Sequence, residues 1–323
     1  MNQTVQRLIA PYKGILAADE STPSITKRFA ALGLTSTPEL NRKYREMLFT
    51  TTDIEKYVSG VILFGETIKQ GLGQILKEKG IEVGIKVDEG LESFNGTDEQ
   101  LTKGLDGLSE RLEEYKNLGA TFTKWRMVVK ITDNFPSDPF LTENLNRMAD
   151  YAKIVQDHGM TPIVEPEVLL DGNHTNTRCE EITTKTLKKL FEVLKSKNVD
   201  FDNLILKASM VIPGNKSGVI VMPLEVSNST LRTLQNSVPT EINGIVFLSG
   251  GQTPDQATFN LNEINKLNKD HKFGNWDLTF SYGRALQEEA MKVWAGKDEN
   301  VEAAQKVFIE RLQKVSKARM GEL

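Results

Sequence analysis

Lysine and glutamate side chains interrupt several segments that otherwise consist of apolar and β-branched residues. Lys207 ends the run Leu-Ile-Leu-Lys, Lys86 lies in Gly-Ile-Lys-Val-Asp, and Lys124 lies in Phe-Thr-Lys-Trp-Arg. Glu165 and Glu167 lie in Ile-Val-Glu-Pro-Glu. Such side chains are almost never fully buried unless they are paired, because an isolated buried charge is costly. Charges on several separate strands therefore predict one shared polar cavity, which is typical of an enzyme.

Lys207 is the strongest candidate for a nucleophile. A lysine that attacks a carbonyl carbon must be a neutral amine, and the reference pKa of lysine is about 10.4. Burial and neighbouring cations such as Lys86 and Lys124 lower a lysine pKa toward neutrality. The alternative is a lysine that extends from a strand end to reach a structural carboxylate. The presence of several lysines on separate strands favours the nucleophile.

Carboxylates of two kinds accompany these lysines. Glu165 and Glu167 share one face of a strand, about 7 Å apart, and burial beside a like charge suits such a group to acid and base work. Both glutamates also suit the role of counter-ions for Lys124 and Lys207. Asp19 lies in Asp-Glu-Ser-Thr-Pro, where a Ser or Thr cap followed by proline predicts a helix start. Capping by Ser21 and Thr22, with Asp19 compensating the helix dipole, therefore explains these residues as well as chemistry does.

Two segments rich in glycine predict an anion site. One of them, Ser249-Gly250-Gly251, follows the strand predicted at 244–248. The other, Ser281-Tyr-Gly283-Arg284, begins at the end of the strand predicted at 278–282. Glycines allow backbone N–H groups to approach an anion, helix N-termini favour negative charge, and the arginine guanidinium group matches phosphate geometry. A lysine nucleophile, carboxylates and a phosphate site together predict Schiff-base chemistry on a phosphorylated carbonyl compound.

The elements that must position these residues alternate along the chain between short apolar strands and amphipathic helices. Periodicity and breakers predict strands at 14–18, 60–64, 83–87, 122–129, 161–164, 204–208, 244–248 and 278–282. Helices are predicted at 106–117, 141–158, 183–197, 223–236, 255–268, 285–294 and 301–317.

Strands that alternate with helices in this way indicate a parallel sheet. With eight strands the prediction is a single (β/α)8 TIM barrel of class α/β, with N-terminal and C-terminal helical extensions, forming one domain over residues 1–323. An open doubly wound sheet is the alternative, but its glycine-rich first turn is missing. In a barrel the charged strand ends meet at one mouth, where active sites lie.

Composition excludes several classes of function. The net charge of −4 and a pI near 5.7 give no electrostatic signature of nucleic-acid binding. No apolar run approaches the ~18 residues of a membrane span, and the N-terminus lacks the pattern of a secretory signal. The single cysteine excludes an internal disulfide framework. We therefore expect a cytoplasmic protein without membrane contact.

The three histidines, His158, His174 and His271, are scattered along the sequence. Zinc sites usually draw on clustered His and Cys ligands, so we expect no metal site. His174 lies in the polar segment Asp-Gly-Asn-His-Thr-Asn and is expected to be solvated.

At this point the sequence closely resembles the class I fructose-1,6-bisphosphate aldolases, which use a Schiff base and no metal. The resemblance is carried by ordered segments from about residue 10 to residue 300, including Gly-Ile-Leu-Ala-Ala-Asp-Glu-Ser-Thr, Gly-Leu-Asp-Gly-Leu-Ser-Glu-Arg, Phe-Leu-Ser-Gly-Gly-Gln and Leu-Thr-Phe-Ser-Tyr-Gly-Arg. It implies an aldehyde-lyase of glycolysis and gluconeogenesis, with phosphorylated ketose and triose substrates and no cofactor. It also implies a homo-oligomer, with a tetramer expected from the family.

The resemblance also implies roles for individual residues. Lys207 would form the Schiff base, Glu165 would be the acid and base of that step, and Asp19 would accept the C4 hydroxyl proton. Glu167 and Lys124 would be the electrostatic partners of Glu165. The C1 phosphate would bind Ser249, Gly250, Gly251, Ser281, Gly283 and Arg284. The C6 phosphate end would lie near Ser21, Ser24, Arg28, Lys86 and Arg126.

Three features depart from the family pattern. Lys207 is followed by Ala-Ser where Pro-Asn is usual, and Gly65 replaces a common histidine. Members often carry a C-terminal tail that ends in tyrosine and assists proton transfer on the enamine; the sequence given, which ends at Leu323, shows no such segment. The resemblance leaves open the preference among fructose 1,6-bisphosphate, fructose 1-phosphate, tagatose and sedoheptulose bisphosphates. A phospho-sugar sensor without catalysis is the alternative from another class.

Overall fold

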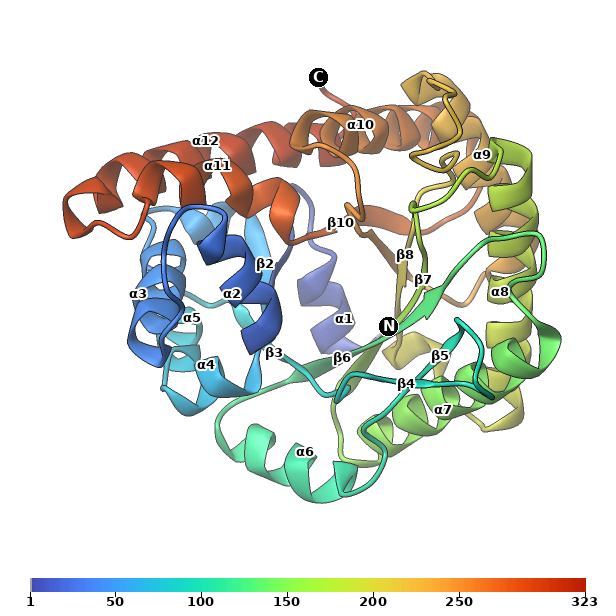
Figure 1. Cartoon of the computed structure of the whole chain (residues 1–323), viewed down its shortest axis with the longest axis horizontal. Coiled ribbons are helices and arrows are strands. Elements are labelled where there is room, and N and C mark those ends of the chain that lie inside the picture. Colours follow the sequence, from blue (N-terminus) through green and yellow to red (C-terminus); the bar gives the residue numbers. More distant parts are fainter. Residues whose placement is uncertain (1) are drawn as a thin grey trace.

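The computed structural model describes residues 2–323, and its centre is a closed barrel of eight parallel strands (Figure 1). The order around the barrel is β1-β10-β9-β8-β7-β6-β3-β2. The strands are β1 Gly14–Ala18, β2 Val58–Leu63, β3 Glu82–Lys86, β6 Phe122–Val129, β7 Thr161–Val168, β8 Ile205–Ala208, β9 Gly244–Phe247 and β10 Asp277–Tyr282. The barrel predicted from the alternation of strands and helices is therefore confirmed, and the open sheet is excluded.

One predicted strand was too short. The sequence prediction ended at residue 164, whereas β7 continues through Glu165, Pro166 and Glu167 to Val168. Proline is tolerated here because the pairing of β7 with β8 ends at Val164, so that no ladder hydrogen bond is lost on that edge. Glu165 and Glu167 are consequently held by a regular strand.

Helices surround the barrel and overlap all seven predicted helical segments. They are α1 Gln3–Leu8, α2 Thr22–Ala30, α3 Pro38–Phe49, α4 Gly65–Lys69, α5 Gly73–Glu78, α6 Leu108–Asn117, α7 Asp138–Asp157, α8 Asn176–Ser196, α9 Pro223–Ser237, α10 Pro254–His271, α11 Arg284–Trp294 and α12 Val301–Arg319. Short 3-10 turns lie at η1 Ile54–Lys56, η2 Phe201–Asn203 and η3 Asp298–Asn300. α7 and α8 begin earlier than predicted because Ser137 and Thr175 cap them through their side chains.

The N-terminal helix closes one end of the barrel. Val5, Leu8 and Ile9 are buried against inward-facing residues of the strands, including Ile15 and Phe122. Strand glycines make room for this plug, because a Cβ at Gly60 would lie 2.4 Å from Leu8 and a Cβ at Gly244 would lie 2.6 Å from Ile9. The opposite end, where the strands finish, is left for a cavity.

A small hairpin lies between β3 and α6 and is anchored near that open end. It consists of β4 Leu91–Ser93 and β5 Gln100–Thr102. The buried Glu99 carboxylate accepts hydrogen bonds from the N–H and the hydroxyl of Ser137 at 2.8 and 2.6 Å. The hairpin is thereby fixed to the start of α7.

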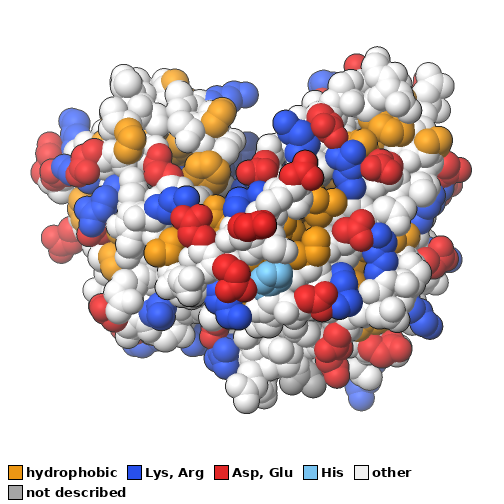
Figure 2. Space-filling view, turned by 90° about the horizontal axis from the view of Figure 1, so that it is seen from below, with side chains coloured by type: hydrophobic (Ala, Val, Ile, Leu, Met, Phe, Trp, Pro, Cys, Tyr) orange, Lys and Arg blue, Asp and Glu red, His pale blue; other side chains and the backbone are white. Residues whose placement is uncertain are grey.

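The surface carries charges of both signs. On the face in Figure 2, Lys and Arg side chains are interspersed with Asp and Glu, and the outline is hollowed at its upper edge. None of the helices described for residues 2–323 has the length and apolar character needed to span a membrane.

Two observations concern metal ligands. Within residues 2–323, no three His, Cys, Asp or Glu side chains are arranged to hold a metal ion. The expectation that His174 is solvated was wrong: its ring is 6% exposed, because the segment after β7 packs against the segment that follows β8, where Gly214 N donates to His174 O.

Candidate active site

All of the site residues predicted from the sequence line one cavity of about 1190 Å³ at the C-terminal ends of the strands. They are Lys207, Glu165, Asp19, Lys124, Glu167, Ser249, Gly250, Gly251, Ser281, Gly283, Arg284, Lys86, Arg126, Arg28, Ser21 and Ser24. The parallel strands end at the same side of the barrel, and this brings residues that are up to 265 positions apart in sequence, Asp19 and Arg284, to one cavity.

Lys207 and Glu165 form a buried pair at the centre of this cavity. Lys207 projects from β8 and Glu165 from the neighbouring strand β7, with Nζ 2.9 Å from Oε1. Both side chains are about nineteen-twentieths buried, at 5% and 4% exposure. The other oxygen of Glu165, Oε2, is buried and makes no hydrogen bond within the described chain. It can therefore hydrogen-bond to a ligand on the lysine.

Lys124 connects this pair to two further carboxylates. Its Nζ lies 2.7 Å from Asp19, 3.5 Å from Glu165 and 3.8 Å from Asp88. Burial lowers the pKa of Lys124, but the attraction of these three carboxylates outweighs burial and raises it well above the ordinary value. Lys124 is therefore a fixed positive charge beside the Lys207–Glu165 pair.

Asp19 belongs to the cluster of buried charges around Lys124 rather than to a helix cap. Burial raises its pKa, yet Lys124, Lys207 and Lys86 together lower it well below the ordinary range, so Asp19 stays ionised. Ser21 occupies the cap position of α2, but its side chain makes no capping hydrogen bond and lies 3.2 Å from the hydroxyl of Ser24. Side-chain capping by Ser21 is therefore not supported, and Asp19 is engaged by lysines rather than left to the helix dipole.

Glu167 is held against the cavity wall by Arg126. The guanidinium Nε of Arg126 pairs with Oε2 of Glu167. A Cβ at Gly250 would lie 2.8 Å from Oε1 of the same glutamate, so the glycine is needed for this close approach. Arg126 and Glu167 therefore connect the middle of the cavity to the segment that follows β9.

The segments after β9 and within β10 supply free hydrogen-bond donors. The hydroxyl of Ser281 is buried without a hydrogen-bond partner. No carboxylate of residues 2–323 lies within ion-pair distance of Arg284 at the start of α11, although that side chain lines the cavity. Gly251 has φ +78°, a conformation that favours glycine. These features suit an anion such as phosphate.

Two further cations of the cavity are partly neutralised. Arg28 NH1 lies 2.6 Å from Oε1 of Glu20, and Lys86 Nζ lies 2.6 Å from Oδ1 of Asp88. Together with Arg126 they place three cations along the wall formed by β3, β6 and α2.

Asp88 and Glu20 line the cavity but were not among the site residues predicted from the sequence. Asp88 follows Lys86 by two residues and so shares its strand parity, which was the signal available. Glu20 directly follows Asp19, but nothing in the local pattern shows that it contacts Arg28 and a side chain from α11.

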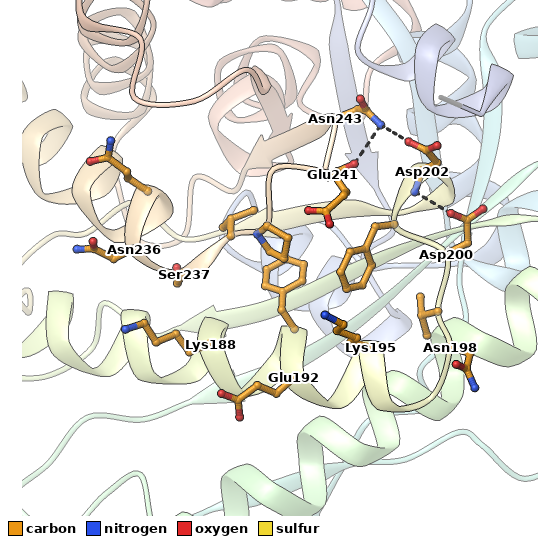
Figure 3. Close-up of a pocket in the computed structure, with 16 residues that line it drawn as sticks. Lys188, Glu192, Lys195, Asn198, Asp200, Asp202, Asn236, Ser237, Glu241 and Asn243 are labelled. Carbon is orange, nitrogen blue, oxygen red and sulfur yellow. Dashed lines mark hydrogen bonds between the residues drawn. The ribbon is translucent and has the colours of Figure 1, made fainter.

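A second cavity lies at the opposite end of the barrel (Figure 3). It measures about 820 Å³ and is bordered by the end of α8, η2 and the segment between α9 and β9. Asn243 donates to Asp202 at 3.0 Å and to the main-chain oxygen of Glu241 at 3.3 Å (Figure 3). None of the predicted site residues lines it, and the charged cluster at the mouth remains the candidate active site.

Comparison with known proteins gives a consistent result. A family model described as "Glycolytic: Fructose-bisphosphate aldolase class-I" matches residues 1–323. The chain is 46% identical over 318 residues to a cytosolic fructose-bisphosphate aldolase 4 of Arabidopsis thaliana, covering 96% of this chain and 80% of the relative. It is 45% identical over 330 residues to a probable fructose-bisphosphate aldolase class 1 of Xanthomonas campestris, covering 99% and 97%.

A solved structure is similar throughout. Fructose-bisphosphate aldolase of Plasmodium falciparum, crystallised with TRAP and a small-molecule inhibitor, superimposes with a TM-score of 0.95 at 42% identity. The match covers 99% of this chain and 93% of that one. The similarity therefore includes every element that carries a residue of the cavity.

Proposed function

The chain belongs to the class I fructose-bisphosphate aldolase family, and from this premise we propose that Lys207 forms the Schiff base through which it reversibly cleaves fructose 1,6-bisphosphate. The products are dihydroxyacetone phosphate and glyceraldehyde 3-phosphate. The observation that carries the assignment is the Lys207–Glu165 pair, in which one carboxylate oxygen contacts the amine and the other makes no hydrogen bond within the described chain.

The first step forms the imine. The neutral amine of Lys207 adds to the C2 carbonyl carbon, and protonated Glu165 then gives its proton to the carbinolamine hydroxyl group, which leaves as water. The resulting iminium ion withdraws electrons from the C3–C4 bond. Lys124 remains protonated and favours the ionised form of Glu165 after the proton has been transferred.

The second step breaks the C3–C4 bond. Asp19 accepts the proton of the C4 hydroxyl group, the C4 oxygen becomes the aldehyde of glyceraldehyde 3-phosphate, and the bonding electrons move into the iminium to form an enamine. Asp19 pairs with Lys124 at 2.7 Å, which supports a joint role of the two groups in this step. Protonation of the enamine at C3 and hydrolysis then release dihydroxyacetone phosphate and restore Lys207.

Two groups of residues bind the phosphates at either end of the substrate. The C1 phosphate is bound by Ser249, Gly250, Gly251, Ser281, Gly283 and Arg284. The C6 phosphate end is bound by Ser21, Ser24, Arg28, Lys86 and Arg126. The unpartnered Ser281 hydroxyl and the unpaired Arg284 support the first assignment, and the cations around Glu20 and Asp88 support the second.

Borohydride trapping tests the function directly. Incubation with dihydroxyacetone phosphate, EDTA and borohydride is expected to leave a reduced adduct on Lys207, located by peptide mass mapping, and none on Lys207→Ala. Saturable binding of the sugar phosphate without any adduct would instead support a sensor that lacks catalysis. Trapping in competition between fructose, tagatose and sedoheptulose bisphosphates would rank the substrates.

We further propose that residues 1–323 form one domain that acts as a cytoplasmic homo-oligomer, with a tetramer expected. The match of one family model to the whole chain supports the single domain, and the cytosolic Arabidopsis relative supports the location. Analytical ultracentrifugation measures the oligomeric state, and a monomer at micromolar concentration would contradict the proposal.

A further inference from the structure

Gln287 is a fully buried amide next to the cavity, which it does not line, and both its nitrogen and its oxygen make hydrogen bonds. It lies on α11, one helical turn after Arg284. Its Nε2 donates to the main-chain oxygen of Ala17 at 2.8 Å and to Oε1 of Glu20 at 3.1 Å. Its Oε1 accepts from the hydroxyl of Tyr44 at 3.0 Å.

These contacts lie on both sides of Asp19 in the sequence. Ala17 precedes Asp19 by two residues, and Glu20 follows it directly. The main-chain oxygen of Glu20 also accepts from the buried Arg45 at 2.7 Å, and its Oε1 accepts from Arg28 at 2.6 Å. The main chain that carries Asp19 is therefore fixed at two points, and α11 supplies one side of the restraint.

The orientation of the Gln287 amide is set by Tyr44 on α3. Tyr44 packs against Phe29 and Trp294, with ring centroids 5.7 and 5.3 Å away. Burial raises the pKa of the Tyr44 hydroxyl, so it stays neutral and donates to the amide oxygen. The amide nitrogen consequently faces Ala17 and Glu20. The Gln287 side chain thereby links α11, which begins at Arg284, to Ala17 of β1 and to Glu20 in the segment after it.

We propose that Gln287 is a positioning residue for cleavage of the carbon–carbon bond, which it serves by holding Asp19 at the C4 hydroxyl group of the substrate. This inference rests on the proposed function, because it assigns Asp19 to the cleavage step. Lys207 and Glu165 share none of the Gln287 hydrogen bonds and project from β8 and β7. Loss of the Gln287 contacts therefore slows cleavage and spares formation of the imine.

The test compares the two steps in Gln287→Met, a side chain of similar length that cannot hydrogen-bond in the same way. A misplacement of about 1 Å costs about 100-fold in rate, so kcat for cleavage of fructose 1,6-bisphosphate is expected to fall about 10- to 100-fold. Borohydride trapping of dihydroxyacetone phosphate on Lys207 is expected to proceed at the wild-type rate. A parallel loss of trapping and cleavage would mean a merely structural role and would overturn the proposal.

Two further variants keep the test decisive. Tyr44→Phe removes only the hydroxyl that orients the amide and is expected to slow cleavage about two- to tenfold, the effect of one hydrogen bond; this variant decides the matter if Gln287→Met does not fold. Asn203→Leu removes a comparable amide that contacts Thr161 and Met160 at the other end of the barrel, and it should cleave normally.

The outcomes separate this inference from the proposed function. Failure of the wild-type protein to form an adduct on Lys207 would refute the proposed function. An adduct in the wild type, together with wild-type cleavage by both Gln287→Met and Tyr44→Phe, would refute only the role of Gln287.

Discussion

The amine of Lys207 lies 2.9 Å from one carboxylate oxygen of Glu165, while the other oxygen of that glutamate is buried and makes no hydrogen bond within the described chain. Among the described residues this oxygen has only the ion pair with Lys124 at 3.5 Å, and a buried acceptor that makes no hydrogen bond is destabilising, so a ligand is expected to complete the site. A carbinolamine hydroxyl group on C2 would supply the missing partner.

This relationship predicts that Glu165→Gln slows formation of the imine. The amide keeps the size of the side chain and can still contact Lys207, but it cannot transfer a proton, and loss of a general acid typically costs about 10²- to 10⁴-fold in rate. Rapid mixing with dihydroxyacetone phosphate followed by borohydride quenching measures the rate. A variant that forms the adduct as fast as the wild type would exclude Glu165 as the proton donor.

Asp19→Asn should show the complementary defect. Because Asp19 acts only when the C3–C4 bond breaks, the variant is expected to form the imine but to cleave fructose 1,6-bisphosphate about 10²- to 10⁴-fold more slowly. Trapping with the bisphosphate should then capture the uncleaved six-carbon adduct on Lys207, which mass spectrometry identifies. Recovery of only the three-carbon adduct would show that another group accepts the proton.

Near neutral pH, the stability contributed by Asp19 and Lys124 should be constant in the wild type and should depend on pH when Lys124 is removed. In the wild type the lowered pKa of Asp19 stabilises the fold above about pH 4, and the stabilisation is lost as pH falls further. The raised pKa of Lys124 stabilises the fold below about pH 10, and this is lost only at higher pH. Between about pH 5 and about pH 9 the contributions of Asp19 and Lys124 are therefore both constant.

In Lys124→Met the contribution of Asp19 to the free energy of unfolding is expected to depend on pH in the opposite direction. Burial is the largest single influence on the pKa of Asp19, and only Lys207 and Lys86 then oppose it. We expect the pKa to rise above the unfolded value, so that protonation stabilises the folded state as pH falls. Breaking a buried ion pair costs about 3–5 kcal/mol, and we expect that loss at pH near 8 and a smaller one at pH near 5. Denaturant unfolding at the two pH values measures it. Equal losses at both would contradict the assignment of Asp19 as the partner of Lys124.

Much of this site was predictable because two local patterns in the sequence indicate it: charges at the ends of apolar strands, and the alternation of side chains along a strand. Lys207 and Lys86 were found because a charge at the end of an apolar strand is costly unless it is paired, and the alternation of strands and helices implied that such ends meet. The parity of Lys124 with Arg126, and of Glu165 with Glu167, correctly placed each pair on one face.

Other features could not be predicted because they depend on contacts between distant segments. Glu20 meets Gln287, which is 267 residues away, and no local pattern signals that contact. The strand predicted at 161–164 ended too early, and only the position of β8 shows how β7 continues through Pro166. His174 was expected in solvent because its neighbours in sequence are polar, whereas tertiary packing buries it.

Gly250→Ala tests whether Glu167 must keep its position. The added Cβ would lie 2.8 Å from Oε1 of Glu167 and 2.6 Å from the side chain of Leu248, so the glutamate and the segment after β9 must shift. The KM for fructose 1,6-bisphosphate is expected to rise about tenfold, equivalent to ~1.4 kcal/mol of binding. Gly73→Ala, where the Cβ makes only an ordinary contact of 3.4 Å with Val83, is the matched control and should leave KM unchanged.

Arg284→Ala should weaken the binding of phosphorylated substrates without affecting the chemistry of the imine. Arg284 lines the cavity and no carboxylate of residues 2–323 lies within ion-pair distance of it, so its guanidinium group is free to bind the C1 phosphate. Loss of a charged hydrogen bond costs about 1.5–3 kcal/mol, which predicts a KM about 10- to 100-fold higher. Trapping of unphosphorylated dihydroxyacetone on Lys207 should be unchanged, since that ligand lacks the phosphate.

Arg178→Ala, which removes an exposed arginine paired with Glu181 on α8, controls for the loss of charge. An unaltered KM in Arg284→Ala, or an equal rise in Arg178→Ala, would remove Arg284 from the phosphate site.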